Sequence, residues 1–441
     1  MSLSTLPDDI VTRGTPAFRS NLMEIGPRRR ARRLLGSLTA ALLVVWLVGC
    51  SVSIGLPTQD KTFAITTVLP TSGPDAAIGQ AMQQAVDLAV KQNAALGNGF
   101  TLTAVHVDEA GDDPGAIVSS LAGNQRVMGI IGPLDSQSAV AMLPGIEQAG
   151  ITTISPGATL PGLTQADQAA AEGLQFAQLH PQGKPVAFFR LPESDTAAGK
   201  VAADLAVAPV KTHGLAAQSV FLVDDGTPSG KTLAGAFVQE LKAKGGTSAG
   251  RLTLQLGVPD SAQAAVTAIV KAAPDIVFFG GGAAAAAQLR GTLSLTGAQN
   301  LAILTVGQAA DHPDWGTAVG VAAAAANTTA LLPAPDLSTL DGAKDFIAAY
   351  QAAYAGQDPL PQAALAYDAA MDEVAAIKSL VGAGKQVTRA DVLATVASAK
   401  HAGVSGTLAF DAKGDNTTPL GFSLYTCDAQ GAWHFVTALK G

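Results

Sequence analysis

Short apolar runs alternate with segments of helical periodicity along most of the chain. In the first half, the apolar runs bounded by turn residues are residues 63–69, 102–107, 127–131 and 151–154. Segments between them, such as residues 78–93 and 115–122, carry apolar side chains at helical spacing. Strands that alternate with helices in this way predict an α/β fold with a parallel, doubly wound sheet.

The alternation continues in the second half of the chain. Apolar runs predict strands at residues 186–190, 220–223, 252–256 and 276–279. With the helices between them, these strands predict a second α/β unit over residues 186–306. Beyond it, periodicity predicts helices over residues 336–354, 362–381 and 389–399. The last apolar segments predict a terminal antiparallel meander of residues 406–410, 422–425 and 433–436.

The segment 132–164 has the pattern strand end, turn, helix, strand, turn. Asp135 and Ser136 offer N-cap side chains to a helix that Gly150 ends, and a second polar turn covers residues 155–159. Polar turns at neighbouring carboxyl ends of strands predict a ligand crevice, and the N-terminus of a helix there suits an anion such as a carboxylate. The alternative is a pair of ordinary connections between strands and helices.

The N-terminal region has the features of an export signal. A basic cluster, RRRARR, precedes an apolar run at residues 34–48 and the sequence LVGC, which ends at Cys50. The order resembles a bacterial lipobox, so we expect residues 1–49 to be a signal peptide, Cys50 to carry lipid, and residues 50–61 to form a tether. A permanent membrane anchor is the alternative, but the run of about 15 apolar residues is shorter than the ~20 that span a bilayer. Both the general secretory route and the twin-arginine route stay open.

Charge and cysteine content exclude several kinds of partner. Of the net charge of −8, residues 1–49 contribute +4, so the remaining chain carries −12. An acidic body argues against nucleic acid as a partner. Once Cys50 is lipidated, the other cysteine, Cys427, has no partner for a disulfide. No cysteine–histidine metal spacing or HExxH motif occurs, so we expect neither a metal site nor a cofactor.

A series of motifs resembles one family over nearly the whole exported body, from about residue 63 to residue 436. In order, the motifs are LPTSGPDAAIGQAM, NAALGNGF, DEAGDDP, GPLDSQS, ISPGATLPGLT, FRLPESDTAAG, PDIVFFGG, AYDAA and GTLAFDAKGDN. They resemble the type I periplasmic binding proteins of the leucine/isoleucine/valine-binding kind. These proteins are the solute receptors of branched-chain amino acid ABC importers.

The resemblance implies two doubly wound, Rossmann-like lobes joined by three crossovers that close on a small-molecule ligand. The implied N-terminal lobe is residues 62–193 plus 333–418, and the C-terminal lobe is residues 194–332 plus 419–441. The implied partners are ABC permease subunits. The implied location is the extracytoplasmic face of the cell membrane, which the N-terminal lipid would hold.

The resemblance also implies a set of ligand-binding residues. Ser136 and Thr159 match hydroxyls that hold the ligand carboxylate, Leu134 and Gly157 match backbone contacts, and Asp195 matches the acid that receives the α-ammonium group. The alternative for Ser136 and for Asp195 is a helix N-cap role.

Three positions depart from the family pattern. Ser229 stands where the family often has tyrosine, a family tyrosine near Gly282 is missing, and Gln308 stands at the second acidic partner of the ammonium group. Asp135 occupies a position where a family disulfide can sit. The pocket has therefore lost aromatic walls, and the ligand side chain stays open while its amino-acid end is supported.

Two other motifs point to enzymes but lack the required context. DGTPSGKT resembles a phosphate-binding loop with wrong glycine spacing, and GTSAG at residues 246–250 matches a nucleophile motif without the strand–turn–helix that it needs. We therefore expect no enzymatic activity. Two functions remain: a lipid-anchored solute receptor for an ABC importer, and a sensing lipoprotein of the same fold that signals to a partner.

Overall fold

The computed structural model describes residues 61–111, 113–183, 187–208, 215–320 and 322–440. The expected signal peptide, Cys50 and nearly all of the tether lie outside these residues. No helix within the described ranges is long and apolar enough to cross a membrane.

The first lobe is built on a six-stranded sheet with the order β2-β3-β1-β4-β5-β6. Its strands are β1 (Thr62–Leu69), β2 (Ala95–Gly97), β3 (Phe100–Asp108), β4 (Val127–Ile131), β5 (Thr152–Ser155) and β6 (Phe188–Arg190). All neighbours are parallel except β2, which runs antiparallel to β3. The sheet edge at β2 therefore ends in a hairpin rather than in a crossover.

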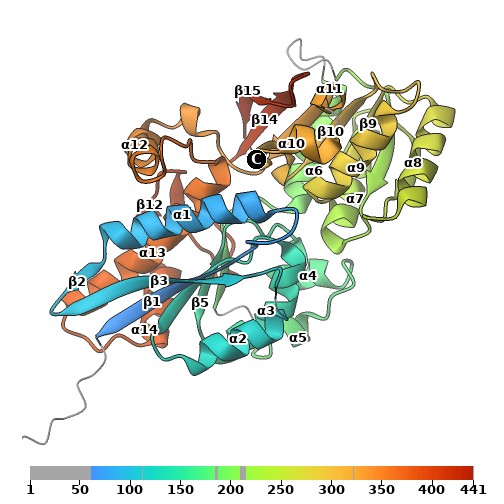
Figure 1. Cartoon of the computed structure of the whole chain (residues 1–441). Coiled ribbons are helices and arrows are strands. Elements are labelled where there is room, and N and C mark those ends of the chain that lie inside the picture. Colours follow the sequence, from blue (N-terminus) through green and yellow to red (C-terminus); the bar gives the residue numbers. More distant parts are fainter. Residues whose placement is uncertain (1–60, 112, 184–186, 209–214, 321, 441) are drawn as a thin grey trace, which may run out of the picture. The chain divides into compact units, whose positions relative to one another are not determined.

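Helices cover both faces of this sheet. One face packs on α1 (Ala76–Gln92) and α13 (Pro361–Gly382), and the other on α2 (Pro114–Gly123) and α3 (Ser136–Ala149). The remaining helices of this part are α4 (Ala166–Ala169), α5 (Phe176–Leu179), α12 (Lys344–Ala353) and α14 (Arg389–Ser398). Figure 1 shows α1 and α13 side by side, and they are in extensive contact.

The second lobe is built on a seven-stranded sheet with the order β15-β14-β11-β10-β9-β7-β8. Its parallel strands are β7 (Ser219–Asp224), β8 (Thr247–Thr253), β9 (Ile276–Gly280), β10 (Ala302–Val306) and β11 (Thr328–Leu332). An antiparallel hairpin of β14 (Phe422–Cys427) and β15 (Trp433–Leu439) extends the sheet beyond β11. Cys427, at the end of β14, is a buried free thiol.

Helices again cover both faces. The apolar side chains of α6 (Asp195–Val207) and α7 (Pro228–Ala243) form one core, and those of α8 (Pro259–Ala272) and α9 (Ala283–Ser294) form the other. The short helices α10 (Trp315–Val319) and α11 (Ala322–Ala325) precede β11. The chain passes between the two sheets after β6, after β11 and after β13 (Thr407–Ala409). Two parallel-sheet α/β lobes confirm the predicted fold class.

Three sequence-based assignments are wrong. The expected helix over residues 336–354 begins only at Lys344, because Asp336 accepts the N–H of Ser338 and starts two short 3-10 turns, Leu337–Thr339 and Asp341–Ala343. The expected three-strand meander does not form, because β13 pairs with β12 (Lys400–Ala402) in a separate sheet. The strand expected at residues 252–256 is β8, which covers Thr247–Thr253. The prediction was misplaced because this exposed edge strand is mostly polar and has no apolar run that marks its start.

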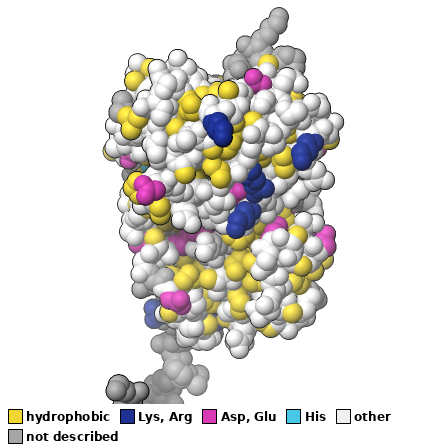
Figure 2. Space-filling view, turned by 90° about the vertical axis from the view of Figure 1, so that its right-hand side faces the viewer, with side chains coloured by type: hydrophobic (Ala, Val, Ile, Leu, Met, Phe, Trp, Pro, Cys, Tyr) yellow, Lys and Arg dark blue, Asp and Glu magenta, His cyan; other side chains and the backbone are white. Residues whose placement is uncertain are grey.

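Figure 2 shows the face at the right of Figure 1, where apolar side chains are exposed among polar ones. The large apolar side chains that the second lobe exposes are Leu252, Leu256, Val258, Val270 and Leu295. Scattered apolar residues are ordinary on protein surfaces, so this face carries no functional argument by itself.

Candidate ligand-binding cleft

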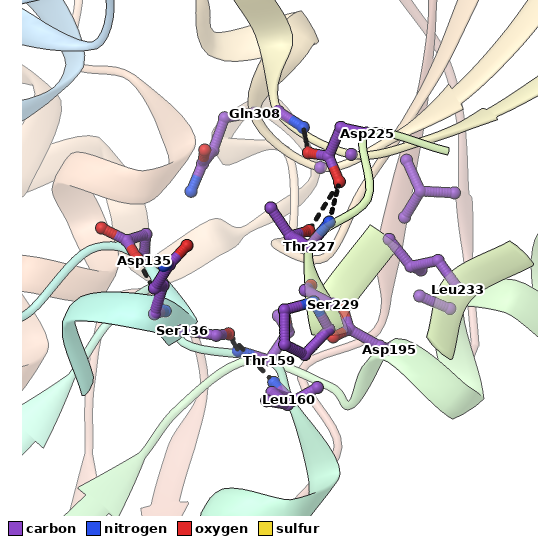
Figure 3. Close-up of a pocket in the computed structure, with 18 of the residues that line it drawn as sticks. Asp135, Ser136, Thr159, Leu160, Asp195, Asp225, Thr227, Ser229, Leu233 and Gln308 are labelled. Atoms are coloured by element: carbon purple, nitrogen blue, oxygen red, sulfur yellow. Dashed lines mark hydrogen bonds between the residues drawn. The ribbon is translucent and has the colours of Figure 1, made fainter. Parts of the chain in front are cut away.

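A cleft of about 460 Å³ lies between residues of the two lobes (Figure 3). Its polar lining includes segments that follow β1, β4, β5 and β6 of the first sheet, and β7, β9 and β10 of the second. The cleft thus lies at the carboxyl ends of parallel strands, which is where open α/β sheets bind ligands. Its volume is in the range of small-molecule sites.

Seven of the eight expected site residues line this cleft, and one does not. The lining residues are Ser136, Gly157, Thr159, Asp195, Ser229, Gly282 and Gln308. They are brought together from segments up to 172 positions apart in the sequence. Their contact with a ligand stays a prediction.

Leu134 is the expected residue that does not line the cleft. Its side chain is buried and its backbone N–H donates to Oε2 of Glu109 at 2.8 Å. A Cβ atom at Gly157 would lie 2.3 Å from the carbonyl oxygen of Leu134. The two residues therefore pack against each other, and this close approach requires glycine at position 157.

Ser136 links the two polar turns of the first lobe. Its Oγ accepts the backbone N–H groups of Thr159 and Leu160, at 3.0 and 3.1 Å. The N-cap of α3 is Asp135, not Ser136, so the alternative role for this serine is wrong. A hydroxyl that accepts two hydrogen bonds still has its own proton to donate, so Ser136 can serve an acceptor in the cleft.

Asp195 is a buried carboxylate at the first position of α6. Ser194 caps this helix, so the alternative N-cap role for Asp195 is also wrong. Oδ2 of Asp195 accepts the hydroxyl of Ser229 at 2.6 Å, and the N–H of Asp195 donates to the carbonyl of Thr159 at 2.9 Å. Burial raises the pKa of Asp195 to about 6, and hydrogen bonds from Ser229 and Thr159 offset part of this rise. A carboxylate so placed favours a cationic partner.

The backbone hydrogen bond between Asp195 and Thr159 joins two of the expected ligand-binding residues. It holds Asp195, at the start of the first α/β element of the second lobe, beside the second polar turn of the first lobe. Ser136, Thr159 and Asp195 therefore lie together where the chain crosses between the lobes.

Three acidic residues that line the cleft were not predicted as site residues: Asp75, Asp135 and Asp225. Asp135 was predicted only as an N-cap and as the position of a family disulfide, and Asp225 was considered only within the phosphate-loop motif. Each follows the carboxyl end of a parallel strand, β1, β4 or β7. That position was the available signal, and Figure 3 shows Asp135 and Asp225 on different sides of the cleft.

Side chains of the protein itself cap three of the helices that begin at the cleft, α3, α6 and α7. Oδ1 of Asp135 accepts the N–H groups of Gln137 and Ser138 at 2.7 and 2.8 Å. Asp225 accepts the N–H of Gly282 at 2.9 Å, the residue before α9, but the first turn of α9 has no side-chain cap. The expectation that the N-terminus of α3 offers free N–H groups to an anion is therefore wrong, because a carboxylate of this chain occupies that position.

The comparisons with known proteins identify the family of this chain. The sequence model of the family described as Periplasmic binding protein matches residues 62–432. A search of curated proteins finds no match.

Solved structures with the same fold include proteins that carry different ligands. A leucine-binding protein, LivK, from Thermotoga maritima is 21% identical, with 86% of this chain and 98% of that chain covered and a TM-score of 0.70. The branched-chain amino acid transporter substrate-binding protein LivJ from Streptococcus pneumoniae, in complex with isoleucine, is 23% identical, with coverage of 86% and 99% and a TM-score of 0.70. A solute-binding protein from R. palustris in complex with benzoate is 21% identical, with coverage of 86% and 97% and a TM-score of 0.65. At these identities the likeness establishes the fold and not the ligand.

Proposed function

The chain belongs to the periplasmic binding protein family, whose members bind solutes outside the cytoplasm and are not enzymes, and from this premise we propose that it is the lipid-anchored receptor of an ABC importer. The proposed ligand is an amino acid or a related small polar solute, held in the cleft between the lobes. The observation that carries the proposal is Asp195, a carboxylate that is 2% exposed at the cleft.

The proposed binding mode uses opposite charges at the amino-acid end of the ligand. The α-ammonium group meets Asp195, whose burial leaves its negative charge poorly solvated. The ligand carboxylate meets the hydroxyls of Ser136 and Thr159, which lie beside Asp195. Closure of the lobes removes water and strengthens this charge pairing as the local dielectric constant falls.

The polar lining supports an ammonium-bearing ligand over a simple aromatic acid. The benzoate-bound relative shows that this fold also serves carboxylic acids without an amine. In this chain, four aspartates line the cleft, and Asp135 already accepts the N–H groups at the start of α3. Like charges at short range are unfavourable, so a benzoate-like anion fits this lining poorly.

The proposed attachment to the membrane is through lipid on Cys50. The ordered basic, apolar and LVGC segments support it. Replacement Cys50→Ala should abolish incorporation of labelled lipid and leave an uncleaved precursor in the native host. A wild-type chain that is released without lipid would contradict this attachment.

The proposed ligand class is tested by a thermal-shift screen with amino acids, amino-acid amides and small carboxylates. A ligand at 100 times its Kd stabilises the folded state by about 2.7 kcal/mol, which raises Tm measurably. We expect stabilisation by at least one amino acid and none by benzoate. Stabilisation by carboxylic acids alone would contradict the proposal.

A further inference from the structure

We propose that Arg190 and Asp415 form a positioning pair behind the cleft. The pair holds the turn of Thr159 and Leu160 in place for the ligand carboxylate. Arg190 also places a fixed positive charge near Asp195. Neither member of the pair lines the cleft, so each acts through residues that do. This inference rests on the proposed function, because it names the residues that arrange the proposed carboxylate and ammonium sites.

Arg190 is a buried cation whose guanidinium group is held at two points. It is the last residue of β6 and is 2% exposed. Its Nη1 donates to the carbonyl oxygen of Leu160 at 2.7 Å, and its Nε donates to Oδ1 of Asp415 at 2.6 Å. A buried charge is tolerated when it is paired and hydrogen-bonded, and Arg190 meets both conditions. Because the guanidinium group is planar, two such bonds fix its orientation and the position of the Leu160 carbonyl.

The turn that Arg190 holds carries the backbone contacts of the candidate site. The N–H groups of Thr159 and Leu160 both donate to Oγ of Ser136, as Figure 3 shows. The carbonyl of Thr159 accepts the N–H of Asp195 at 2.9 Å. A displacement of the Leu160 carbonyl would therefore move the peptide groups that connect the expected ligand-binding residues.

Asp415 fastens the segment after this turn to a crossover. It lies between β13 and β14, in the motif GTLAFDAKGDN. Its carboxylate accepts the hydroxyl of Thr164 at 2.7 Å and the side-chain amide of Gln165 at 3.0 Å, as well as Nε of the arginine. Gly414 lets this loop approach β6, because a Cβ atom there would lie 2.1 Å from the carbonyl oxygen of Phe188. The motif therefore has a structural role at the ligand turn.

The pair also joins two of the three crossovers between the lobes. Arg190 directly precedes the first crossover, and Asp415 lies within the third. The backbone N–H of Arg190 donates to the carbonyl of Gly414 at 3.0 Å, which adds a second link between these segments. We expect the turn and these crossovers to move as one unit when the lobes close, so that the carboxylate site keeps its shape.

The positive charge of Arg190 also acts on the carboxylate of Asp195. Three charged or titratable side chains lie close enough to influence that carboxylate: Arg190 in β6, Asp225 after β7 and Glu172 after α4. Burial is the main cause that raises the pKa of Asp195, to about 6, and Asp225 adds to the rise, whereas Arg190 lowers the pKa. Burial also raises the pKa of Glu172 to about 7, so this acid is partly neutral at pH 7. Arg190 thus favours the ionised form of Asp195 that an ammonium group needs.

The charge role is tested by NMR titration of the exported chain without any ligand. With carboxyl-labelled aspartate, the resonance that is missing from Asp195→Asn identifies Asp195. Arg190→Met should raise the pKa of Asp195 above about 6, because it removes a nearby cation. Arg190→Lys keeps the charge and Asp415→Asn removes only an anion, so neither should raise the pKa. If Arg190→Met does not fold, its combination with Asp415→Asn leaves no member of the pair unpaired and should also raise the pKa.

The positioning role is tested by amide hydrogen exchange of the same proteins. The N–H groups of Thr159 and Leu160 should exchange at least about tenfold faster in Arg190→Met than in wild type, because a charged hydrogen bond that holds the turn is lost. Arg290→Met is the matched control, since it removes another buried arginine that donates to two backbone carbonyls but does not line the cleft. This control should change neither the exchange of the turn nor the pKa of Asp195.

Binding is measured by titration calorimetry at pH 7, with the standard L-amino acids as probes. The amino acid that wild type binds most tightly should bind at least about tenfold more weakly to Arg190→Met. Arg190→Lys should recover part of this loss, because it keeps the charge but not both fixed hydrogen bonds.

The outcomes separate this inference from the proposed function. An unchanged pKa of Asp195 or unchanged exchange of the turn in Arg190→Met, or equal changes in Arg290→Met, would overturn the positioning pair and leave an amino-acid receptor standing. The expected changes in pKa and exchange, without binding of any amino acid to wild type, would support the pair and overturn the amino-acid ligand. Absence of both changes and of any amino-acid binding would overturn both.

Discussion

At the residue scale, Asp195 should have opposite effects on folding stability and on ligand binding. The carboxylate is almost completely buried. Among the described residues, hydrogen bonds from Ser229 and Thr159 and the charge of Arg190, which itself pairs with Asp415, compensate its negative charge. A buried charge without a close counter-ion costs folding free energy. We therefore expect Asp195 to destabilise the empty protein while it stabilises the complex.

The pH dependence of stability should reveal this cost. The pKa of Asp195 rises from 3.8 to about 6 on folding, so the native state holds more protons than the unfolded state between these values. The contribution of Asp195 to stability therefore falls as pH rises from about 4 to 6, by roughly 3 kcal/mol in total. Asp195→Asn should be more stable than wild type in urea unfolding at pH 8 and lose that advantage near pH 4. Equal stability of the two proteins at both pH values would contradict the buried charge.

Ser136 provides a second test at this scale. Ser136→Ala removes the acceptor of the N–H groups of Thr159 and Leu160, so the free energy of unfolding should fall by about 1–3 kcal/mol. Denaturant unfolding measures it. The control Ser119→Ala removes an exposed hydroxyl on α2 and should change stability by less than about 0.5 kcal/mol. If both variants unfold like wild type, Ser136 does not hold the two turns together.

From the sequence, site residues could be predicted only where they lie within a motif that resembles the family. Ser136, Thr159 and Asp195 were identified from the family resemblance, and the structure brings all three to one cleft. Asp75 and Gln362 also line the cleft, but they could not be linked from the sequence, because 287 positions separate them and the long-range packing of α13 against α1 has no local sequence signal.

At the element scale, the sequence predicted most accurately those helices and strands that bury an apolar face. Elements with a buried face, such as α1 and β4, have the apolar spacing that periodicity detects. Edge strand β8 is mostly polar and was assigned too late in the chain. Strand β11 is an exception, because all five of its residues are buried and it was still missed. The register of the terminal hairpin depends on pairing with β11, which local patterns do not encode.

At the contact between β4 and α13, Gly129 leaves space on the sheet for a side chain of the helix. A Cβ atom at Gly129 would lie 1.9 Å from Oε2 of Glu373, and Glu373 is fully buried. Burial raises the pKa of Glu373 well above its usual range. The absence of a side chain at position 129 therefore makes room for this acid.

A double-mutant cycle tests that contact. Gly129→Ala should destabilise the protein by about 1–3 kcal/mol, because an extra methyl group overpacks the site. In the background Glu373→Ala the same replacement should cost less than about 1 kcal/mol, which gives a coupling energy above the error of additivity. Strictly additive effects in denaturant unfolding would show that the two positions do not meet.

At the scale of the whole molecule, the proposal requires that ligand binding draws the two lobes together. A ligand that contacts both walls of the cleft favours the closed population through its differential affinity. Small-angle scattering of the exported chain should therefore show a smaller radius of gyration with saturating ligand than without it. An unchanged profile at saturation, verified by calorimetry on the same sample, would contradict closure.

The central claim is that Asp195 binds the ammonium group of an amino-acid ligand, and calorimetry of Asp195→Ala tests it most directly. Loss of one partner in a buried charge pair costs about 2–5 kcal/mol, so the variant should bind the ligand found by screening roughly 30- to 4000-fold more weakly than wild type. Asp204→Ala, which removes an exposed acid on the same helix, should bind like wild type. If Asp195→Ala also binds like wild type, the claim is contradicted.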